Sequence, residues 1–165
     1  MKNIVLIGMP GAGKSTIGVL LAKSMLMDFV DTDLLIHKKC SESLCGIIAA
    51  KGIDEFLKIE NDVICESVFE NSVVATGGSA VYGEEAMAKL RAEGVAVYLK
   101  LSPEELVRII DNIHTRGIAM KDGTSIADLY AERAPVYEKY ADITVDCEGL
   151  TPEQCVDMIT KACIG

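Results

Sequence analysis

The chain has 165 residues, half of them apolar, and a formal net charge of −9 at pH 7. A chain of this length fits one domain with a substantial core. The acidic balance, with a pI of about 4.7, argues against nucleic acid or an anionic membrane as a partner. Six cysteines without a CxxC pair, no signal-like beginning and no apolar run of membrane length lead us to expect a protein of the reducing cytoplasm.

Short apolar runs alternate with segments of helical periodicity along the chain. The expected strands are residues 3–7, a run from residue 29 to the Asp31/Asp33 pair, and residues 73–75, 94–101 and 143–145. The expected helices are residues 15–27, 34–50, 54–70, 84–93 and 126–140, and two that begin at Ser102–Pro103 and Thr151–Pro152. This alternation predicts a single α/β domain whose five-stranded parallel sheet is flanked by helices on both faces.

One segment breaks the periodicity for longer than any other. Residues 115–124, TRGIAMKDGT, contain three charged residues and two glycines. We therefore expect a mobile lid around residues 112–125 of a domain that covers residues 1–165.

The stretch GMPGAGKS at residues 8–15 fits the phosphate-loop pattern G-x-x-x-x-G-K-[ST], between an expected strand and an expected helix. Glycines let backbone N–H groups turn toward phosphate oxygens, and the helix N-terminus adds partial positive charge. Lys14 can reach the outer phosphates, and the Ser15 hydroxyl can coordinate Mg²⁺. The predicted nucleotide-binding residues are Gly11, Ala12, Gly13, Lys14, Ser15 and Thr16. The sequence thus predicts a site for a nucleoside triphosphate with Mg²⁺.

A dinucleotide-binding fingerprint, G-x-G-x-x-G, is the rival interpretation of these glycines. Asp31 and Asp33 lie at about the distance of its ribose-binding acid. The rival fails because Thr16 stands in place of the third glycine, and because it leaves Lys14 and Ser15 without a purpose.

Two carboxylates, Asp31 and Asp33, end the second expected strand. In an extended segment these positions point to the same side, where like charges repel. Helix capping before Leu34 is the alternative role, but one aspartate would suffice for it. We therefore expect the pair to meet a ligand at the carboxyl edge of the sheet.

With these motifs the chain resembles the shikimate kinases, within the nucleoside-monophosphate-kinase-like group of phosphate-loop enzymes. D-T-D at residues 31–33, V-A-T-G-G-S at 74–79 and E-R-A-P-V-Y at 132–137 extend the resemblance over nearly the whole chain. It implies a kinase that transfers phosphate from Mg-ATP to a hydroxyl of shikimate, in aromatic amino acid biosynthesis. Separately, we expect a monomer that binds these small molecules and neither nucleic acid nor a membrane. Two alternatives stay open: a kinase of the same fold acting on another hydroxy acid or a hydroxy amino acid, and a non-catalytic nucleotide-binding regulator.

The resemblance also implies roles for individual residues. An arginine suits the acceptor's carboxylate because its planar fork can pair with both oxygens. The implied acceptor-binding residues are Asp33, Gly77, Gly78 and Arg133. The implied catalytic residues are Lys14, Asp31 and Arg116, with Ser15 and Asp31 as the metal ligands.

The chain departs from the family pattern at the acceptor site and in the lid. The family's F-R-x-x-E stretch, whose arginine also holds the acceptor carboxylate, corresponds here to FLKIE at residues 56–60, so Leu57 stands in the arginine's place. Lys58 is turned about 100° around the helix and is not expected to substitute. In the lid, Gly117 replaces a proline, which should loosen the segment. We expect Tyr137 to serve packing rather than chemistry.

Overall fold

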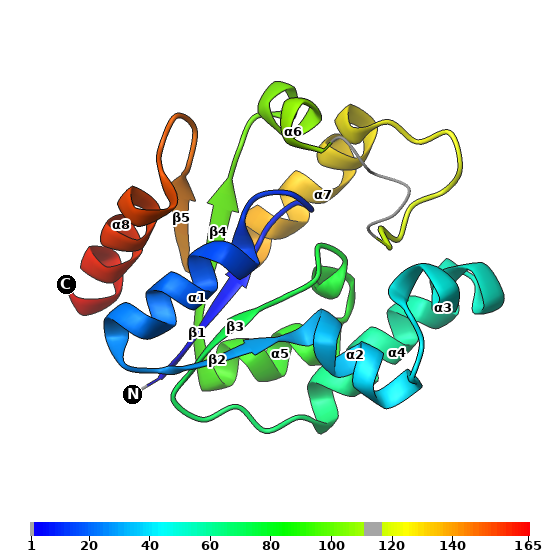
Figure 1. The fold of residues 1–165 in the computed structure, drawn as a ribbon, viewed down its shortest axis with the longest axis horizontal. Helices are drawn as coiled ribbons and strands as arrows, with labels where there is room; N and C mark the ends of the chain where they lie inside the picture. Colours follow the sequence, from blue (N-terminus) through cyan, green and yellow to red (C-terminus); the bar gives the residue numbers. More distant parts are fainter. Residues whose placement is uncertain (1, 111–116) are drawn as a thin grey trace.

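Five parallel strands form the centre of the computed structural model, which describes residues 2–110 and 117–165 (Figure 1). The strands are β1 (Asn3–Ile7), β2 (Asp28–Asp31), β3 (Ser72–Ala75), β4 (Gly94–Lys100) and β5 (Ile143–Asp146). Their order in the sheet is β2-β3-β1-β4-β5, and every neighbouring pair is parallel. The predicted five-stranded parallel sheet is therefore confirmed.

Helices cover both faces of this sheet. They are α1 (Lys14–Met25), α2 (Thr32–Cys40), α3 (Leu44–Lys51), α4 (Ile53–Glu66), the 3-10 turn η1 (Ala80–Tyr82), α5 (Glu84–Glu93), α6 (Pro103–Ile109), α7 (Ile126–Tyr140) and α8 (Pro152–Ile164). α1 and α8 pack together on one face, α5 and α7 lie against the other, and α2, α3 and α4 gather beyond the β2 end of the sheet (Figure 1). None of the described helices is both long and apolar enough to cross a membrane.

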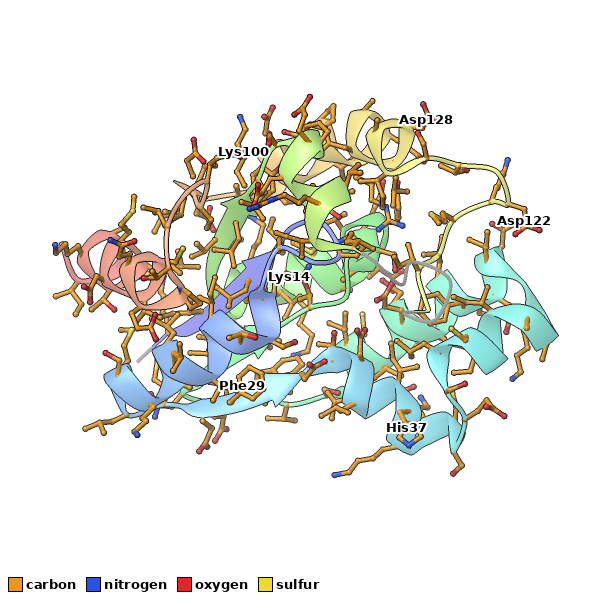
Figure 2. All side chains as sticks on the ribbon, turned by 45° about the horizontal axis from the view of Figure 1, so that its top comes forward. Lys14, Phe29, His37, Lys100, Asp122 and Asp128 are labelled. Carbon is orange, nitrogen blue, oxygen red and sulfur yellow. The ribbon has the colours of Figure 1, made fainter. Side chains whose placement is uncertain are left out.

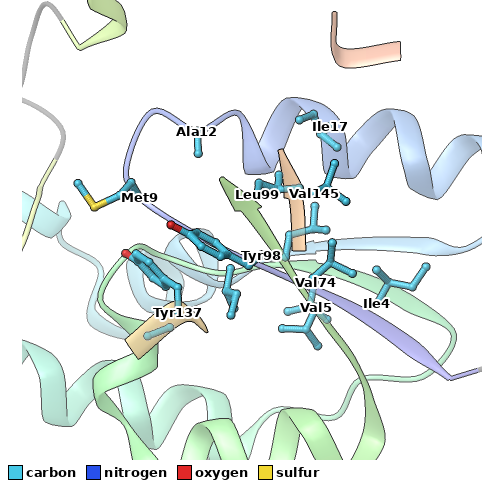
Figure 3. Packing of buried hydrophobic residues seen from close by; sticks show 14 of the residues in the cluster. Ile4, Val5, Met9, Ala12, Ile17, Val74, Tyr98, Leu99, Tyr137 and Val145 are labelled. Atoms are coloured by element: carbon cyan, nitrogen blue, oxygen red, sulfur yellow. The ribbon is translucent and has the colours of Figure 1, made fainter. Parts of the chain in front are cut away.

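The three central strands, β1, β3 and β4, are almost wholly buried, whereas the edge strands β2 and β5 are partly exposed. Val5 and Val74 are fully buried and stand opposite each other across β1 and β3, a pairing visible in the core of Figure 3. Parallel strands enclosed in this way read as continuous apolar runs rather than alternating ones. The expected helix starts also hold, since the hydroxyls of Ser102 and Thr151 each accept a backbone N–H three residues on.

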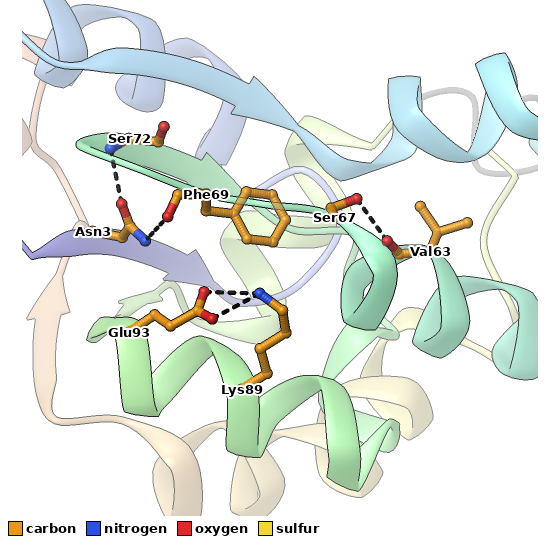
Figure 4. Close-up of polar contacts among 7 residues, drawn as sticks. All are labelled: Asn3, Val63, Ser67, Phe69, Ser72, Lys89 and Glu93. Atoms are coloured by element: carbon orange, nitrogen blue, oxygen red, sulfur yellow. Dashed lines mark hydrogen bonds and ion pairs between the residues drawn. The ribbon is translucent and has the colours of Figure 1, made fainter.

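Two expected helices end earlier than the periodicity suggests. Residues 34–50 form two helices, because Ser41 takes a left-handed conformation and Ser43 caps α3 by accepting the Gly46 N–H at 3.0 Å. α4 stops at residue 66, where the Ser67 hydroxyl donates to the Val63 carbonyl at 2.6 Å (Figure 4). Serine hydroxyls that bond to nearby backbone groups compete with helical hydrogen bonds in this way.

The ends of three neighbouring strands position the functional residues. The segment that follows β1 is the phosphate loop, β2 ends at Asp31, and β3 leads into residues 76–79. Because β1, β2 and β3 are parallel, these three segments meet at the carboxyl edge of the sheet, where ligands bind in folds of this kind.

Candidate active site

The phosphate loop has the backbone that its glycines predict. Gly8, Gly11 and Gly13 have φ angles of 147°, 84° and 88°, and α1 begins immediately after the last of them. Glycine takes such positive values without the clash that a Cβ would cause. The loop therefore curves at the N-terminus of α1, as an anion-binding loop requires.

Lys14 lies inside this loop rather than in solvent (Figure 2). Its Nζ donates to the carbonyls of Gly8, at 2.7 Å, and Met9, at 2.8 Å. Burial lowers the pKa of Lys14 to about 8, against the opposing pull of the carboxylate of Asp33. At neutral pH the loop thus contains its own protonated cation, held by backbone oxygens.

Asp31 joins the sheet, helix α2 and the phosphate loop. As the N-cap of α2 it accepts the N–H of Asp33 at Oδ1, at 2.9 Å, and its Oδ2 accepts the Ser15 hydroxyl at 2.8 Å. The expectation that both aspartates share one side of an extended segment is wrong, because the helix begins at Thr32 and Asp33 lies in its first turn. The hydroxyl and carboxylate oxygens of Ser15 and Asp31 fit Mg²⁺, which takes few protein ligands and keeps phosphate and water oxygens for the rest.

Asp33 faces a second carboxylate across Gly77. A Cβ on Gly77 would stand 2.6 Å from Asp33 Oδ1 and 2.7 Å from Glu60 Oε2, so a larger residue would displace one or both carboxylates. Burial raises the pKa of Asp33 to about 6, with a further contribution from Asp31. Two acidic groups of elevated pKa thus border the same glycine.

Glu60 is the functional candidate that the sequence did not identify. It is 1% exposed, its Oε1 accepts the Ser79 hydroxyl at 2.6 Å, and its Oε2 has no hydrogen-bond partner among the described residues. Burial raises its pKa to about 7. The signal in the sequence was the glutamate of the stretch at residues 56–60, to which no role was attached.

Arg133 enters the site from α7. It is 1% exposed, its Nη2 donates to the Ala119 carbonyl at 2.8 Å, and its Nε has no hydrogen-bond partner in residues 2–110 and 117–165. Its Nη1 lies 3.0 Å from the position that a Cβ on Gly78 would occupy. A buried guanidinium with an unused donor is suited to an anionic group of a ligand.

One cavity of about 530 Å³ brings these groups together. Its lining includes Lys14, Ser15, Thr16, Asp33, Gly77, Gly78 and Arg133. Except for Ala12, the predicted nucleotide- and acceptor-binding residues thus border a common space, whereas Asp31 is not among its lining residues. This arrangement suits the transfer of a phosphoryl group to a small anionic molecule. Arg116 lies outside the described residues, so its predicted place stays a prediction.

Leu57 borders a different space. It lines a neighbouring cavity of about 1420 Å³ and packs against the apolar cluster of α2, α3 and α4. Lys58, the next residue on α4, is exposed, as expected for a residue on another side of the helix. Neither side chain supplies a cation to the 530 Å³ cavity.

Comparison with known proteins identifies the family to which this chain belongs. The family model for shikimate kinase matches residues 10–164. The shikimate kinase of Francisella tularensis subsp. novicida is 38% identical over 163 residues, covering 96% of this chain and 93% of its own. The structure of shikimate kinase from Acinetobacter baumannii in complex with shikimate superposes with a TM-score of 0.90 at 25% identity, covering 99% of this chain and 93% of its own. Shikimate kinase from Aquifex aeolicus gives 0.83 at 32% identity, covering 99% and 96%. The chain therefore belongs to the shikimate kinase family.

Proposed function

We propose that this protein transfers the γ-phosphoryl group of ATP to a hydroxyl of shikimate, giving shikimate 3-phosphate for aromatic amino acid biosynthesis. The observation that carries the proposal is the common cavity, in which Lys14 of the phosphate loop and Arg133 of α7 line the same space. Membership of the family and the likeness to a shikimate-bound structure support the choice of acceptor.

The nucleotide half of the site consists of the loop and the first turn of α1. Backbone N–H groups of residues 11–16 receive the phosphates, and Lys14 exchanges its bonds to the Gly8 and Met9 carbonyls for bonds to phosphate oxygens. Ser15 and Asp31 would hold Mg²⁺, which neutralises phosphate charge when it is bound. Phosphate oxygens thus replace the two backbone carbonyl oxygens as acceptors for the ammonium group of Lys14.

The acceptor half of the site consists of Asp33, the turn at Gly77 and Gly78, and Arg133. Arg133 pairs with the acceptor's carboxylate, and Asp33 accepts hydrogen bonds from its hydroxyls. Asp31 orients the reacting hydroxyl or takes its proton as the new O–P bond forms and ADP leaves. Arg116 is proposed to neutralise charge on the transferred group.

The wider organisation is proposed on the same grounds. We propose that residues 1–165 act as one kinase domain and that the segment 112–125, of which residues 112–116 lie outside the described residues, closes over the bound substrates. We further propose that the protein works as a monomer in the cytoplasm. Sedimentation of the purified protein at micromolar concentration tests the oligomeric state, and a dimer mass would contradict the proposal.

The direct test is formation of ADP by the purified protein with Mg-ATP and shikimate. Other hydroxy acids and hydroxy amino acids form the comparison panel. Lys14→Ala should abolish turnover while the circular dichroism spectrum stays unchanged, and Lys23→Ala, exposed in the last turn of α1, is the matched control. Turnover of another acceptor but not of shikimate would reject the proposal, as would a Lys14→Ala protein of normal activity.

A further inference from the structure

The turn at residues 76–79 has a flexible backbone, although its place at the cavity requires a fixed conformation. It contains two consecutive glycines, Gly77 and Gly78, which are half-exposed and line the 530 Å³ cavity. Glycine has the largest range of backbone conformations and loses the most entropy when fixed. A binding turn of this composition keeps one shape only if other parts of the protein hold it.

Each of the four residues is held by a different element. The Thr76 hydroxyl donates to the Leu6 carbonyl of β1 at 2.8 Å, and the Gly77 N–H donates to the hydroxyl of Thr32 in α2 at 3.2 Å. The Ser79 hydroxyl donates to Glu60 of α4. The Gly78 carbonyl accepts the hydroxyl of Tyr137 in α7 at 2.6 Å, and no other hydrogen bond to this carbonyl is present in the described part of the chain.

Tyr137 contacts the turn and the side chain of Arg133 from outside the cavity. It is fully buried, its ring stacks on that of Tyr98 with centroids 5.2 Å apart (Figure 3), and it is not among the residues that line the cavity. Burial also raises its pKa, so the phenol keeps the proton that it donates. Because the peptide unit is planar, holding the Gly78 carbonyl also sets the direction of the Ser79 N–H.

The same face of α7 supplies the acceptor-binding arginine. Arg133 and Tyr137 are four residues apart, so they lie one turn apart on one side of the helix. Both approach Gly78, Arg133 through Nη1 and Tyr137 through its hydroxyl. The hydrogen bond thus fixes the turn at a set position relative to the guanidinium.

We propose that Tyr137 is a positioning residue for acceptor binding, which acts by fixing the Gly78 carbonyl and thereby the glycine turn opposite Arg133. This inference rests on the proposed function, since the acceptor is taken to be shikimate. It revises the expectation that Tyr137 serves packing alone.

The test is the variant Tyr137→Phe, which keeps the ring and removes the hydroxyl. We expect the KM for shikimate to rise about 5- to 12-fold, the factor for a lost hydrogen bond of roughly 1–1.5 kcal/mol. The kcat and the KM for ATP should stay within about twofold of the wild type, because the Tyr137 hydroxyl bonds to Gly78 and not to the phosphate loop or Asp31. Calorimetric titration with shikimate should show the same loss of affinity.

Tyr98→Phe is the matched control, because it removes a phenol from the same stack. The Tyr98 hydroxyl makes no hydrogen bond with the turn, so its removal should leave the KM for shikimate unchanged. An unchanged KM in Tyr137→Phe would overturn the inference. So would equal increases in the KM of both substrates, or the same effect from Tyr98→Phe, since each would indicate general loosening of the core.

Failure of the proposed function gives a different result, namely no turnover of shikimate by the wild type. If Tyr137→Phe should not fold, tyrosine-selective NMR of the wild-type protein replaces it. The ring signals of Tyr137 should shift on saturation with shikimate but not with ADP. Signals that stay in place with shikimate would overturn the inference.

Discussion

Replacing Glu60 with glutamine should change how the stability of this protein depends on pH. The pKa of Glu60 is raised from its ordinary value of 4.5 to about 7, mainly by burial. The folded state therefore holds this proton more tightly than the unfolded state does. By linkage, the free energy of unfolding of the wild type should fall as pH rises from about 4.5 to about 7.

The size of the effect follows from the interval between the two pKa values. The protonated Glu60 contributes roughly 3 kcal/mol to the free energy of unfolding. The wild type has this contribution below pH 4.5 and has lost it above pH 7. A glutamine at position 60 has no such titration, and it keeps an oxygen for the Ser79 hydroxyl. Its amide group can also stand where Oε2 now lies, next to the Asp33 carboxylate across Gly77.

Urea unfolding at pH 5 and pH 8 measures the effect. The stability of Glu60→Gln relative to the wild type should increase by an amount on the order of 2–3 kcal/mol between the two pH values. Asp33 titrates in both proteins, so the comparison largely removes its contribution. The control is Glu55→Gln, at an exposed position of the same helix, and its curve should run parallel to that of the wild type. A Glu60→Gln curve that is also parallel would refute the reasoning.

Three further results are expected at the acceptor site and the lid. Asp33→Asn should raise the KM for shikimate at least about tenfold and that for ATP little, and below pH 6 the wild-type KM for shikimate should rise because the pKa of Asp33 is about 6; equal weakening of both substrates would place Asp33 on the nucleotide. Leu57 lines the neighbouring cavity, which shares Gly117, Ile118 and Ala119 with the acceptor cavity. We expect the longer side chain of Leu57→Arg to reach the acceptor's carboxylate from there and to lower the KM for shikimate by roughly 10- to 150-fold, the factor for one charge-assisted bond of 1.5–3 kcal/mol. Lys58→Arg is the control, and a higher KM in Leu57→Arg would mean that Leu57 is adapted to another acceptor. Amide exchange in residues 117–125 should slow when a non-hydrolysable ATP analogue binds, and equal rates with and without it would contradict a lid.

Local signals in the sequence were sufficient wherever a structural feature depends on neighbouring residues. The phosphate loop needs only its glycines, a strand before it and a helix after it. Likewise, Ser102 and Thr151 cap their helices through N–H groups three residues away. The break near Ser41 was missed because no glycine or proline marks it, although Ser43 is a good capping residue.

Features that depend on contacts between residues far apart in the sequence could not be predicted from local sequence patterns. Glu60 acquires its raised pKa from burial among α2, α4 and the turn after β3, which lie far apart in the sequence. Tyr137 meets Gly78 across 59 positions of the chain. The inward bonds of Lys14 to the loop carbonyls depend on the folded path of that loop, although the sequence did predict that Lys14 belongs to it.

The two carboxylate oxygens of Asp31 make different hydrogen bonds, which affects how variants at this position can be interpreted. One oxygen secures the first turn of α2, and the other reaches the Ser15 hydroxyl. An alanine at position 31 would remove both at once, so an inactive Asp31→Ala protein says nothing about chemistry by itself. An asparagine can still cap the helix while losing the negative charge. A substitution at position 31 therefore affects the stability of α2 and the contact with Ser15 at the same time, so natural selection on folding and on turnover constrains the same residue.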